Sequence, residues 1–249
     1  MTMKRRYFKK HLTDEQQHQL LAHIEGSGLA TDIELGKHVD HNCSVVFFDL
    51  CDFTRISWSL ANGQVIAILQ ALFGHISTRV AQRNGMIDKY PGDGVVAFFP
   101  RHYCDTEDLV VEAALDCVAD VMSWFYGSTD SPANKSAKKL NLSVGVDAGF
   151  VSIAHVGSSY HSELILLGKQ VNCASKCEQM AGNKQVIVGD DAAKRVRALY
   201  SRHFRAGPDI DLTHASVAKT YKSYIFDWEP FAETSIWIDK PNRRPTDPQ

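Results

Sequence analysis

Residues 44–54 read SVVFFDLCDFT, an apolar run that ends on two carboxylates, Asp49 and Asp52. The β-branched and aromatic residues of this run predict a buried strand that carries both acids to an edge of the core. A buried carboxylate without a partner is costly to ionise, so a strand that ends in this way is typical of a cation site. The rest of the chain has to provide a second ligand.

A second acid, Asp93, lies in the turn of a predicted hairpin. The hairpin consists of MIDKY (86–90), PGDG (91–94) and VVAFFP (95–100). A strand, a helix and a returning strand separate Asp93 from Asp49, so adjacent antiparallel strands would bring both acids to one edge of a sheet. Two aspartates at such an edge form a minimal Mg²⁺ or Mn²⁺ site that leaves positions for water and phosphates. The alternative is that Asp93 is only a turn residue.

Composition sets the broad class of the protein. With 249 residues, 44% of them apolar, the chain is long enough to build one sizeable core. Its net charge of -2 gives no support for binding nucleic acid through an overall positive field. Its six cysteines include no CxxC pair, so reduced thiols are expected, with Cys173 and Cys177 as packing residues. No apolar run approaches the ~18 residues of a membrane span, so we expect a cytoplasmic protein without stable membrane association.

Hydrophobic periodicity outlines the remaining elements of one domain. A helix is expected over about residues 62–83, with an inward stripe of Val65, Ile66, Leu69, Leu72, Phe73, Ile76 and Val80. The other expected elements are a helix over 105–126, a surface loop over 127–139, strands over 140–149 and 150–157, a helix over 171–181, a strand over 185–189, a helix over 191–200 and strands around 221–228. The strand-helix-strand-strand order recurs in palm-like folds. We therefore predict an α/β (α+β, palm or ferredoxin-like) fold with a central, mostly antiparallel sheet and flanking helices.

The chain divides into three predicted segments. Residues 1–40 form a basic arm and a helix that opens at Thr13, with a polar loop that continues to Asn42. Residues 41–232 form the domain that carries both aspartates, and residues 233–249 form a loose, Pro-rich tail.

Four motifs follow one another in a fixed order along the chain. They are DLCDFT (49–54), KYPGD (89–93), GVDAGFVSIAHVG (145–157) and GKQVNCASK (168–176). In this order they resemble the D-I-x-G-F-T strand end, the K-x-x-G-D hairpin, the Gly-spaced strand pair and the G-x-x-V-N-x-A-S-R helix start of the class III nucleotidyl cyclases. The resemblance covers roughly residues 41–228. It implies the class III cyclase catalytic fold and an enzyme that closes a nucleoside triphosphate into a 3′,5′-cyclic monophosphate with release of pyrophosphate.

The resemblance also assigns the metal and phosphate ligands. It implies that Asp49, Asp93 and the backbone of Leu50 hold two Mg²⁺ or Mn²⁺ ions per site. The backbone amides that it assigns to the triphosphate are those of Cys51, Asp52, Phe53 and Thr54. Successive N–H groups after a strand end form such an anion nest. Asp52 stands where the family usually has Gly, and its side chain is expected to face solvent or a cationic partner rather than the metal.

A second group of residues follows from the last motif. Asn172 matches the family residue that positions the ribose, and Lys176 replaces the arginine that stabilises charge at the α-phosphate. Lysine keeps the positive charge but loses the planar fork of arginine. Lys219 is the expected basic residue that binds the terminal phosphates. In the family the two groups come from different subunits, so the resemblance implies a head-to-tail homodimer with active sites at the interface.

Two positions bear on the base of the substrate. Adenylate cyclases of the family read adenine with a hairpin lysine and an Asp or Thr three residues before the glycine of the last motif; here these positions hold Lys89 and Ile165. Isoleucine cannot accept the amino hydrogens of adenine, so discrimination for adenine would be lost. A lysine donor beside an aliphatic wall suits uracil O4, or cytosine. The chain also resembles the bacterial pyrimidine cyclases of antiphage defence, whose cyclic UMP or cyclic CMP acts on a separate effector protein, and UTP is the favoured substrate.

Three alternatives stay open at this point. The first is an adenylate cyclase with atypical base contacts. The second, suggested by Lys176 and Asp52, is a degenerate cyclase domain that senses nucleotides. The third is a palm-like enzyme such as a diguanylate cyclase or a polymerase, which the absence of a Gly-Gly-Asp/Glu-Glu-Phe hairpin and the weak basicity disfavour. Isolated histidines such as His155 and His161 are assigned no role.

Overall fold

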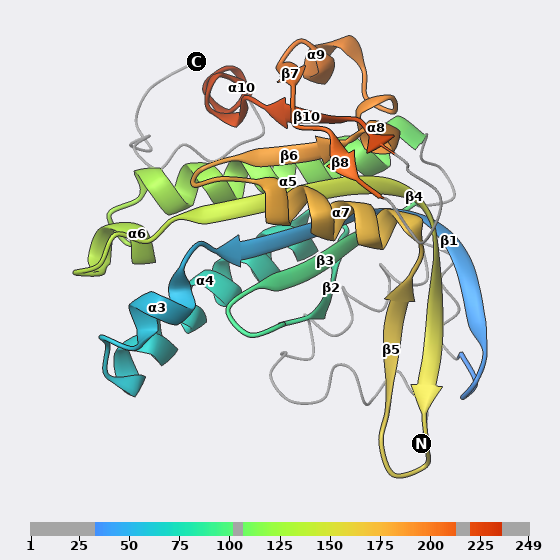
Figure 1. Cartoon of the computed structure of the whole chain (residues 1–249), viewed down its shortest axis with the longest axis horizontal. Coiled ribbons are helices and arrows are strands. Elements are labelled where there is room, and N and C mark those ends of the chain that lie inside the picture. Colours follow the sequence, from blue (N-terminus) through green and yellow to red (C-terminus); the bar gives the residue numbers. More distant parts are fainter. Residues whose placement is uncertain (1–32, 102–106, 213–219, 236–249) are drawn as a thin grey trace.

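The computed structural model describes residues 33–101, 107–212 and 220–235 (Figure 1). Its main sheet runs in the order β2 (Met86–Lys89), β3 (Val95–Pro100), β1 (His38–Leu50), β4 (Leu142–Gly157), β6 (Val186–Gly189), β10 (Ser223–Phe226) and β7 (Phe204–Ala206), and β5 (Ser162–Leu167) also pairs with β4. β4 and β6 are parallel, and the other pairs are antiparallel. A separate two-stranded sheet joins β8 (Ile210–Asp211) to β9 (Thr220–Tyr221).

Helices cover both faces of this sheet. They are α3 (Phe53–Ser57), α4 (Asn62–Gln82), α5 (Glu107–Gly127), α6 (Pro132–Lys135), α7 (Lys169–Met180), α8 (Asp190–Ala193), α9 (Ala198–Ser201) and α10 (Trp228–Thr234). In Figure 1, α4 and α5 lie behind the sheet and α7 lies in front of it. The mostly antiparallel sheet with flanking helices confirms the fold class predicted from the sequence.

Alternate residues of β1 explain the two layers. Val46 and Phe48 belong to a buried cluster that includes residues of α4 and α5, whereas Cys43 and Val45 belong to a second cluster that includes Ala174 of α7. Successive side chains of a strand point to opposite faces of the sheet, so one apolar run fills both cores. The second half of β1 is therefore packed on both faces, and it carries the half-buried Asp49 to the end of the core.

The predicted strands over 140–149 and 150–157 form one continuous strand, β4. The prediction of a break was wrong because β1 pairs with β4 over its whole length, from His38 opposite Ala154 to Leu50 opposite Leu142. This long ladder satisfies the backbone groups of both strands without a turn. For the same reason β1 begins at His38, and the loop that was expected to reach Asn42 ends earlier.

Two helix predictions also need correction. Ile66, expected in the inward stripe of α4, is 65% exposed, because the buried stripe is Ile68, Leu72, Ile76 and Val80 and Ile66 lies on the other side of the helix. The predicted helix over 191–200 is divided into α8 and α9. Between them, the backbone N–H and the guanidinium group of Arg197 donate to the carboxylate of Glu112, which replaces the helical hydrogen bonds at this point.

The cysteines that the structure describes agree with a further prediction. Cys173 and Cys177 are buried beside Ile187 and Ile210, which confirms their packing role, and the described cysteines are free thiols. None of the helices that the structure describes has the length and apolar character needed to cross a bilayer. The helix expected after Thr13 lies outside the described residues.

Asp147, in β4, is a fully buried carboxylate. It accepts hydrogen bonds from the hydroxyl of Tyr221 at 2.9 Å and from the backbone N–H of Ala192 at 3.2 Å. Burial, opposed by these bonds, raises the pKa of Asp147 to about 7, and the charge of Asp191 adds to the effect.

Stability should therefore fall as the pH rises towards neutrality. Folded Asp147 retains its proton between pH 4 and pH 7 whereas the unfolded residue loses it, so its contribution to the free energy of unfolding should decrease by up to about 1.4 kcal/mol per pH unit. Urea denaturation of the wild type and of Asp147→Asn at pH 5, 6, 7 and 8 measures this. The wild type should lose stability relative to the variant up to about pH 7, and a constant difference would contradict the assignment.

Candidate active site

The structure brings Asp49 and Asp93 together, as the sequence predicted. β1 and β3 pair with Phe48 opposite Val95, so the turn that contains Asp93 lies against the end of β1. The contact is close at Gly94, where a Cβ atom would lie 2.8 Å from the carbonyl oxygen of Phe48 and 3.0 Å from Oδ1 of Asp49. Only a residue without a side chain fits this position unchanged.

Electrostatics at this edge favours a cation. Burial, followed by the charges of Asp93 and Glu178, raises the pKa of Asp49 to about 7, although a hydrogen bond from the N–H of Leu50 lowers it. Neighbouring carboxylates that oppose one another's ionisation are stabilised when a positive charge binds between them.

Glu178 was not predicted from the sequence. Its carboxylate accepts a hydrogen bond from Oγ of Ser143 at 2.8 Å, and burial together with the charge of Asp93 raises its pKa. α7 reaches this place because it packs directly on β4, where a Cβ at Gly145 would lie 2.2 Å from the backbone nitrogen of Glu178. The sequence does contain a signal for this contact: Glu178 is an acidic residue in the helix of the last motif, and Gly145 in β4 leaves room for that helix to pack closely.

These residues fit Mg²⁺ or Mn²⁺ as an open site. Within the ranges that the structure describes, no group of three or more His, Cys, Asp and Glu side chains is arranged to enclose a metal ion. The carboxylates of Asp49 and Asp93, with the backbone of Leu50 beside them, instead match the usual magnesium site, which has one or two protein carboxylates and takes its other ligands from water and phosphates.

The loop after β1 differs in part from the expected phosphate nest. The N–H of Cys51 donates to the carbonyl of Asn141 at 2.9 Å, so this amide extends the sheet and is not available to a phosphate. The amides of Phe53 and Thr54 open α3, where N–H groups have no acceptor within the helix. Lys219 lies outside the described residues.

Asp52 has the left-handed backbone conformation, with φ of 57°. This conformation favours Gly, and Asp tolerates it better than most other residues. The Asp52 side chain is exposed and forms an ion pair with Arg55 at 3.6 Å. It therefore faces solvent and a cationic partner, as the sequence predicted, and not Asp49.

Asn172 and Lys176 lie one turn apart on α7 and share a face. Asn172 is exposed and Lys176 is half-buried. Neither forms a hydrogen bond or an ion pair with Asp49 or Asp93 in the part of the chain that the structure describes, whereas Glu178, which points in another direction, interacts with both. Asn172 and Lys176 thus lie on a different face of α7 from Glu178, the side chain that approaches the two acids.

Lys89 and Ile165 lie on β2 and β5, which contact each other. Leu164 and Leu166 pack into the core cluster beside α7, so Ile165, which alternates with them, points away from it.

Nζ of Lys89 is 3.3 Å from Oδ2 of Asp88, whose side chain is only 4% exposed. Burial raises the pKa of Asp88, and the charge of Glu163 adds to this effect, although Lys89 lowers it. Asp88 and Glu163 therefore belong to the surroundings of Lys89, which the motif alone did not reveal.

Comparison with known proteins agrees with this geometry. The sequence profile of the adenylate and guanylate cyclase catalytic domain matches residues 36–225. An adenylate cyclase of Anabaena cylindrica is 25% identical over 150 residues, which are 59% of this chain and 29% of that protein. Adenylate cyclase 1 of Rhizobium meliloti is 27% identical over 137 residues, which are 55% of this chain and 20% of that protein. The chain thus spans about a third or less of these relatives.

Solved structures share the fold at low sequence identity. The guanylyl cyclase Cya2 superposes with a TM-score of 0.63 at 17% identity, covering 77% of this chain and 93% of that one. The adenylyl cyclase CyaB from P. aeruginosa gives a TM-score of 0.63 at 18% identity, covering 76% and 95%.

Asp49→Asn should remove metal binding without unfolding the protein. We expect Mn²⁺ to raise the Tm of the wild type and not that of the variant, because the variant loses a ligand charge while its carboxylate repulsion is relieved. Thermal unfolding with and without Mn²⁺ measures the effect. Asp52→Asn is the matched control, since this exposed acid three residues away should leave the response intact. A normal response of Asp49→Asn would refute the assignment.

Proposed function

Since the chain belongs to the class III adenylate and guanylate cyclase catalytic domain family, we propose that it converts a nucleoside triphosphate to a 3′,5′-cyclic monophosphate and pyrophosphate. The observation that carries this proposal is the convergence of Asp49 and Asp93 at one sheet edge, in an environment that opposes the ionisation of Asp49. We assign the activity to residues 41–232, with a basic arm before them and a tail after them.

The proposed role of each residue follows from its match to the family motifs. Asp49, Asp93 and the backbone of Leu50 would hold two Mg²⁺ or Mn²⁺ ions, which supply positive charge against the triphosphate when bound. The amides of Asp52, Phe53 and Thr54, together with Lys219, bind the phosphates. Asn172 orients the ribose so that its 3′ oxygen faces the α-phosphorus. The 3′ hydroxyl releases its proton to solvent as the new P–O bond forms and the bond to pyrophosphate breaks, and Lys176 stabilises the charge that develops.

The separation of the two residue groups supports a homodimer. α7 directs Glu178 to the acids of its own chain, while Asn172 and Lys176 face away from them. A head-to-tail second copy would bring its own Asn172 and Lys176 to these acids.

Complementation between inactive variants tests the shared site. Asp49→Asn and Asn172→Ala should each be inactive alone, because each removes one half of every site. An equal mixture should recover about a quarter of the wild-type activity, since half of the dimers are mixed and each of these has one intact site. Cyclic nucleotide formation measures the recovery. A mixture as inactive as its components would contradict the shared site.

We propose UTP as the substrate and cyclic UMP as the product. Lys89 offers a donor to a base carbonyl, and Ile165 offers no acceptor for the amino group of adenine. In this proposal the product is a second messenger of bacterial antiphage defence and acts on a separate effector protein. ATP is the second candidate, because the relatives from Anabaena cylindrica and Rhizobium meliloti are named adenylate cyclases and Lys89 is the lysine that such enzymes use.

Incubation of the purified protein with each of the four nucleoside triphosphates and Mn²⁺ tests the activity. We expect cyclic UMP as the main product by mass spectrometry, and no product from Asp93→Asn. If cyclic AMP is the main product, the substrate is ATP and the proposal of UTP is wrong. Tight nucleotide binding without any cyclic product would instead identify a nucleotide-sensing domain.

The role of Ile165 is open to a specificity test. Ile165→Asp should raise kcat/KM for ATP relative to UTP by about tenfold or more, because a carboxylate accepts the amino hydrogens of adenine. Leu167→Asp, at an exposed position on the same strand face, is the control and should leave the ratio unchanged. An unchanged ratio in Ile165→Asp would mean that Ile165 does not face the base.

A further inference from the structure

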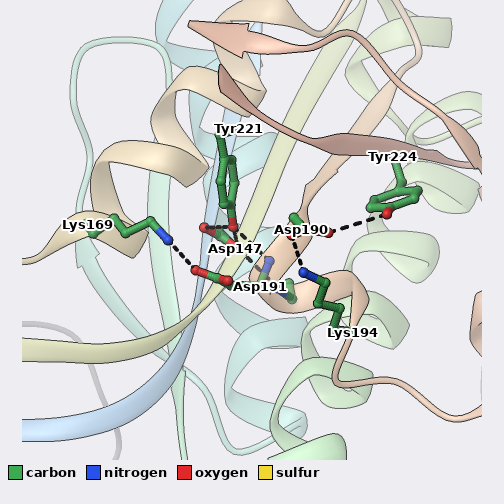
Figure 2. A network of polar contacts seen from close by, with 8 residues as sticks. Asp147, Lys169, Asp190, Asp191, Lys194, Tyr221 and Tyr224 are labelled. Carbon is green, nitrogen blue, oxygen red and sulfur yellow. Dashed lines mark hydrogen bonds and ion pairs between the residues drawn. The ribbon is translucent and has the colours of Figure 1, made fainter. Parts of the chain in front are cut away.

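Four polar side chains from four different elements meet beside the first turn of α7 (Figure 2). Nζ of Lys169 in α7 is 2.6 Å from Oδ2 of Asp191 in α8. The backbone N–H of Asp191 donates to the hydroxyl of Tyr221 in β9 at 2.7 Å, and this hydroxyl donates to Oδ2 of Asp147 in β4 at 2.9 Å. We call Lys169, Asp191, Tyr221 and Asp147 the inner network.

The inner network holds α7 at two successive turns. Lys169 is the first residue of the helix, and its ammonium group also lies 4.7 Å from the centroid of the Tyr221 ring. Cys173, one turn further, is buried in the same cluster as the Tyr221 ring. Burial, with the charge of Asp147 as the next cause, raises the pKa of the Cys173 thiol to about 11, so this side chain lies close to Asp147.

The hydrogen bonds of the inner network restrict the orientations that its side chains can adopt. The Tyr221 hydroxyl accepts from one partner and donates to another, which fixes its orientation, and Asp147 is fully buried. A buried polar network whose members are all satisfied rigidifies the elements that it joins. The joined elements are β4, α7, α8 and β9, of which α7 carries Asn172 beside Cys173 and Lys176 one turn beyond.

We propose that the inner network positions α7 so that Asn172 and Lys176 are held in the orientation that cyclisation requires. Lys169, Asp191, Tyr221 and Asp147 are then positioning residues that act through the helix and do not touch the substrate. The inference rests on the proposed function. It adds a requirement that the four motifs do not contain, since Asp191 and Tyr221 lie outside them.

The molecule contains a natural control beside this network. Asp190, the neighbour of Asp191, forms an ion pair with Lys194 at 2.5 Å and accepts a hydrogen bond from the hydroxyl of Tyr224 at 3.3 Å. This outer network has the same types of residue, and Figure 2 shows it beside the inner one. Asp190 belongs to α8, Lys194 directly follows that helix, and Tyr224 belongs to β10, so none of the three comes from α7.

Paired variants separate positioning from stability. Tyr221→Phe removes the hydroxyl that joins Asp191 to Asp147, and Lys169→Gln removes the charge that pairs with Asp191. Tyr224→Phe and Lys194→Gln remove the corresponding groups from the outer network. Well below the Tm of each variant, we expect the inner variants to lower kcat by about ten- to hundredfold, because small misplacements of catalytic groups have effects of this size. The outer variants should stay within about twofold of the wild type.

Two further readouts distinguish the roles. The affinity for Mn²⁺, measured by titration calorimetry, should be unchanged in all four variants because Asp49 and Asp93 are not altered. Hydrogen exchange of the backbone amides in residues 169–176 should accelerate only in the inner variants. Lys169→Arg should keep most of the wild-type kcat, because it retains the charge that pairs with Asp191.

Each outcome decides the proposal. If kcat falls in proportion to the loss of Tm, and does so equally in the inner and outer variants, the inner network has only a structural role and the proposal is overturned. Unchanged kcat in the inner variants would overturn it as well. If the wild type forms no cyclic nucleotide, the proposed function fails separately. In that case, hydrogen exchange in residues 169–176 decides whether the inner network holds α7. If exchange is unchanged in the inner variants, the positioning role is overturned.

Discussion

The site depends on the packing of a charged turn against a charged strand end. Asp49 stands at the end of a strand buried on both faces, and the turn that carries Asp93 approaches so closely that position 94 has no room for a side chain. The repulsion between the two carboxylates is unfavourable in the protein alone. Divalent cations that bind between the carboxylates would offset it with a favourable attraction. In the proposed function, the same contact carries a cost in stability and provides the affinity for metal.

α7 connects this edge to the rest of the proposed chemistry. The helix lies directly on β4 at Gly145, which directs Glu178 towards the acids of its own chain. Asn172 and Lys176 occupy a different face, so one rigid element serves two surfaces at once. The start of the helix has to be fixed in rotation as well as in position, because a small rotation there would move Asn172 and Lys176, whereas Glu178 is held further along by the packing on Gly145. The inner network acts on the first two turns of this helix.

The base pocket is less strongly determined than the metal edge. Lys89 does not stand alone, because the buried carboxylate of Asp88 holds its ammonium group and Glu163 lies near enough to influence Asp88. Ile165 removes one contact that adenine would need. In the proposed function, a few side chains at the junction of β2 and β5 set the choice of nucleotide within a shared fold. Relatives at this level of identity do not transfer their substrates to this chain.

The sequence by itself determined the elements whose signals are local. The apolar run before Asp49, the turn before Val95 and the periodicity of α4 and α7 each encode their structure within a few residues, so the meeting of Asp49 with Asp93 followed from them. Tertiary structure decided what depends on distant partners: the continuity of β4, the outward side of Ile66, the acceptor of the Cys51 amide, and the places of Glu178 and Tyr221. These features are set by which segments pack together, and such contacts have no signature in the local pattern of either segment.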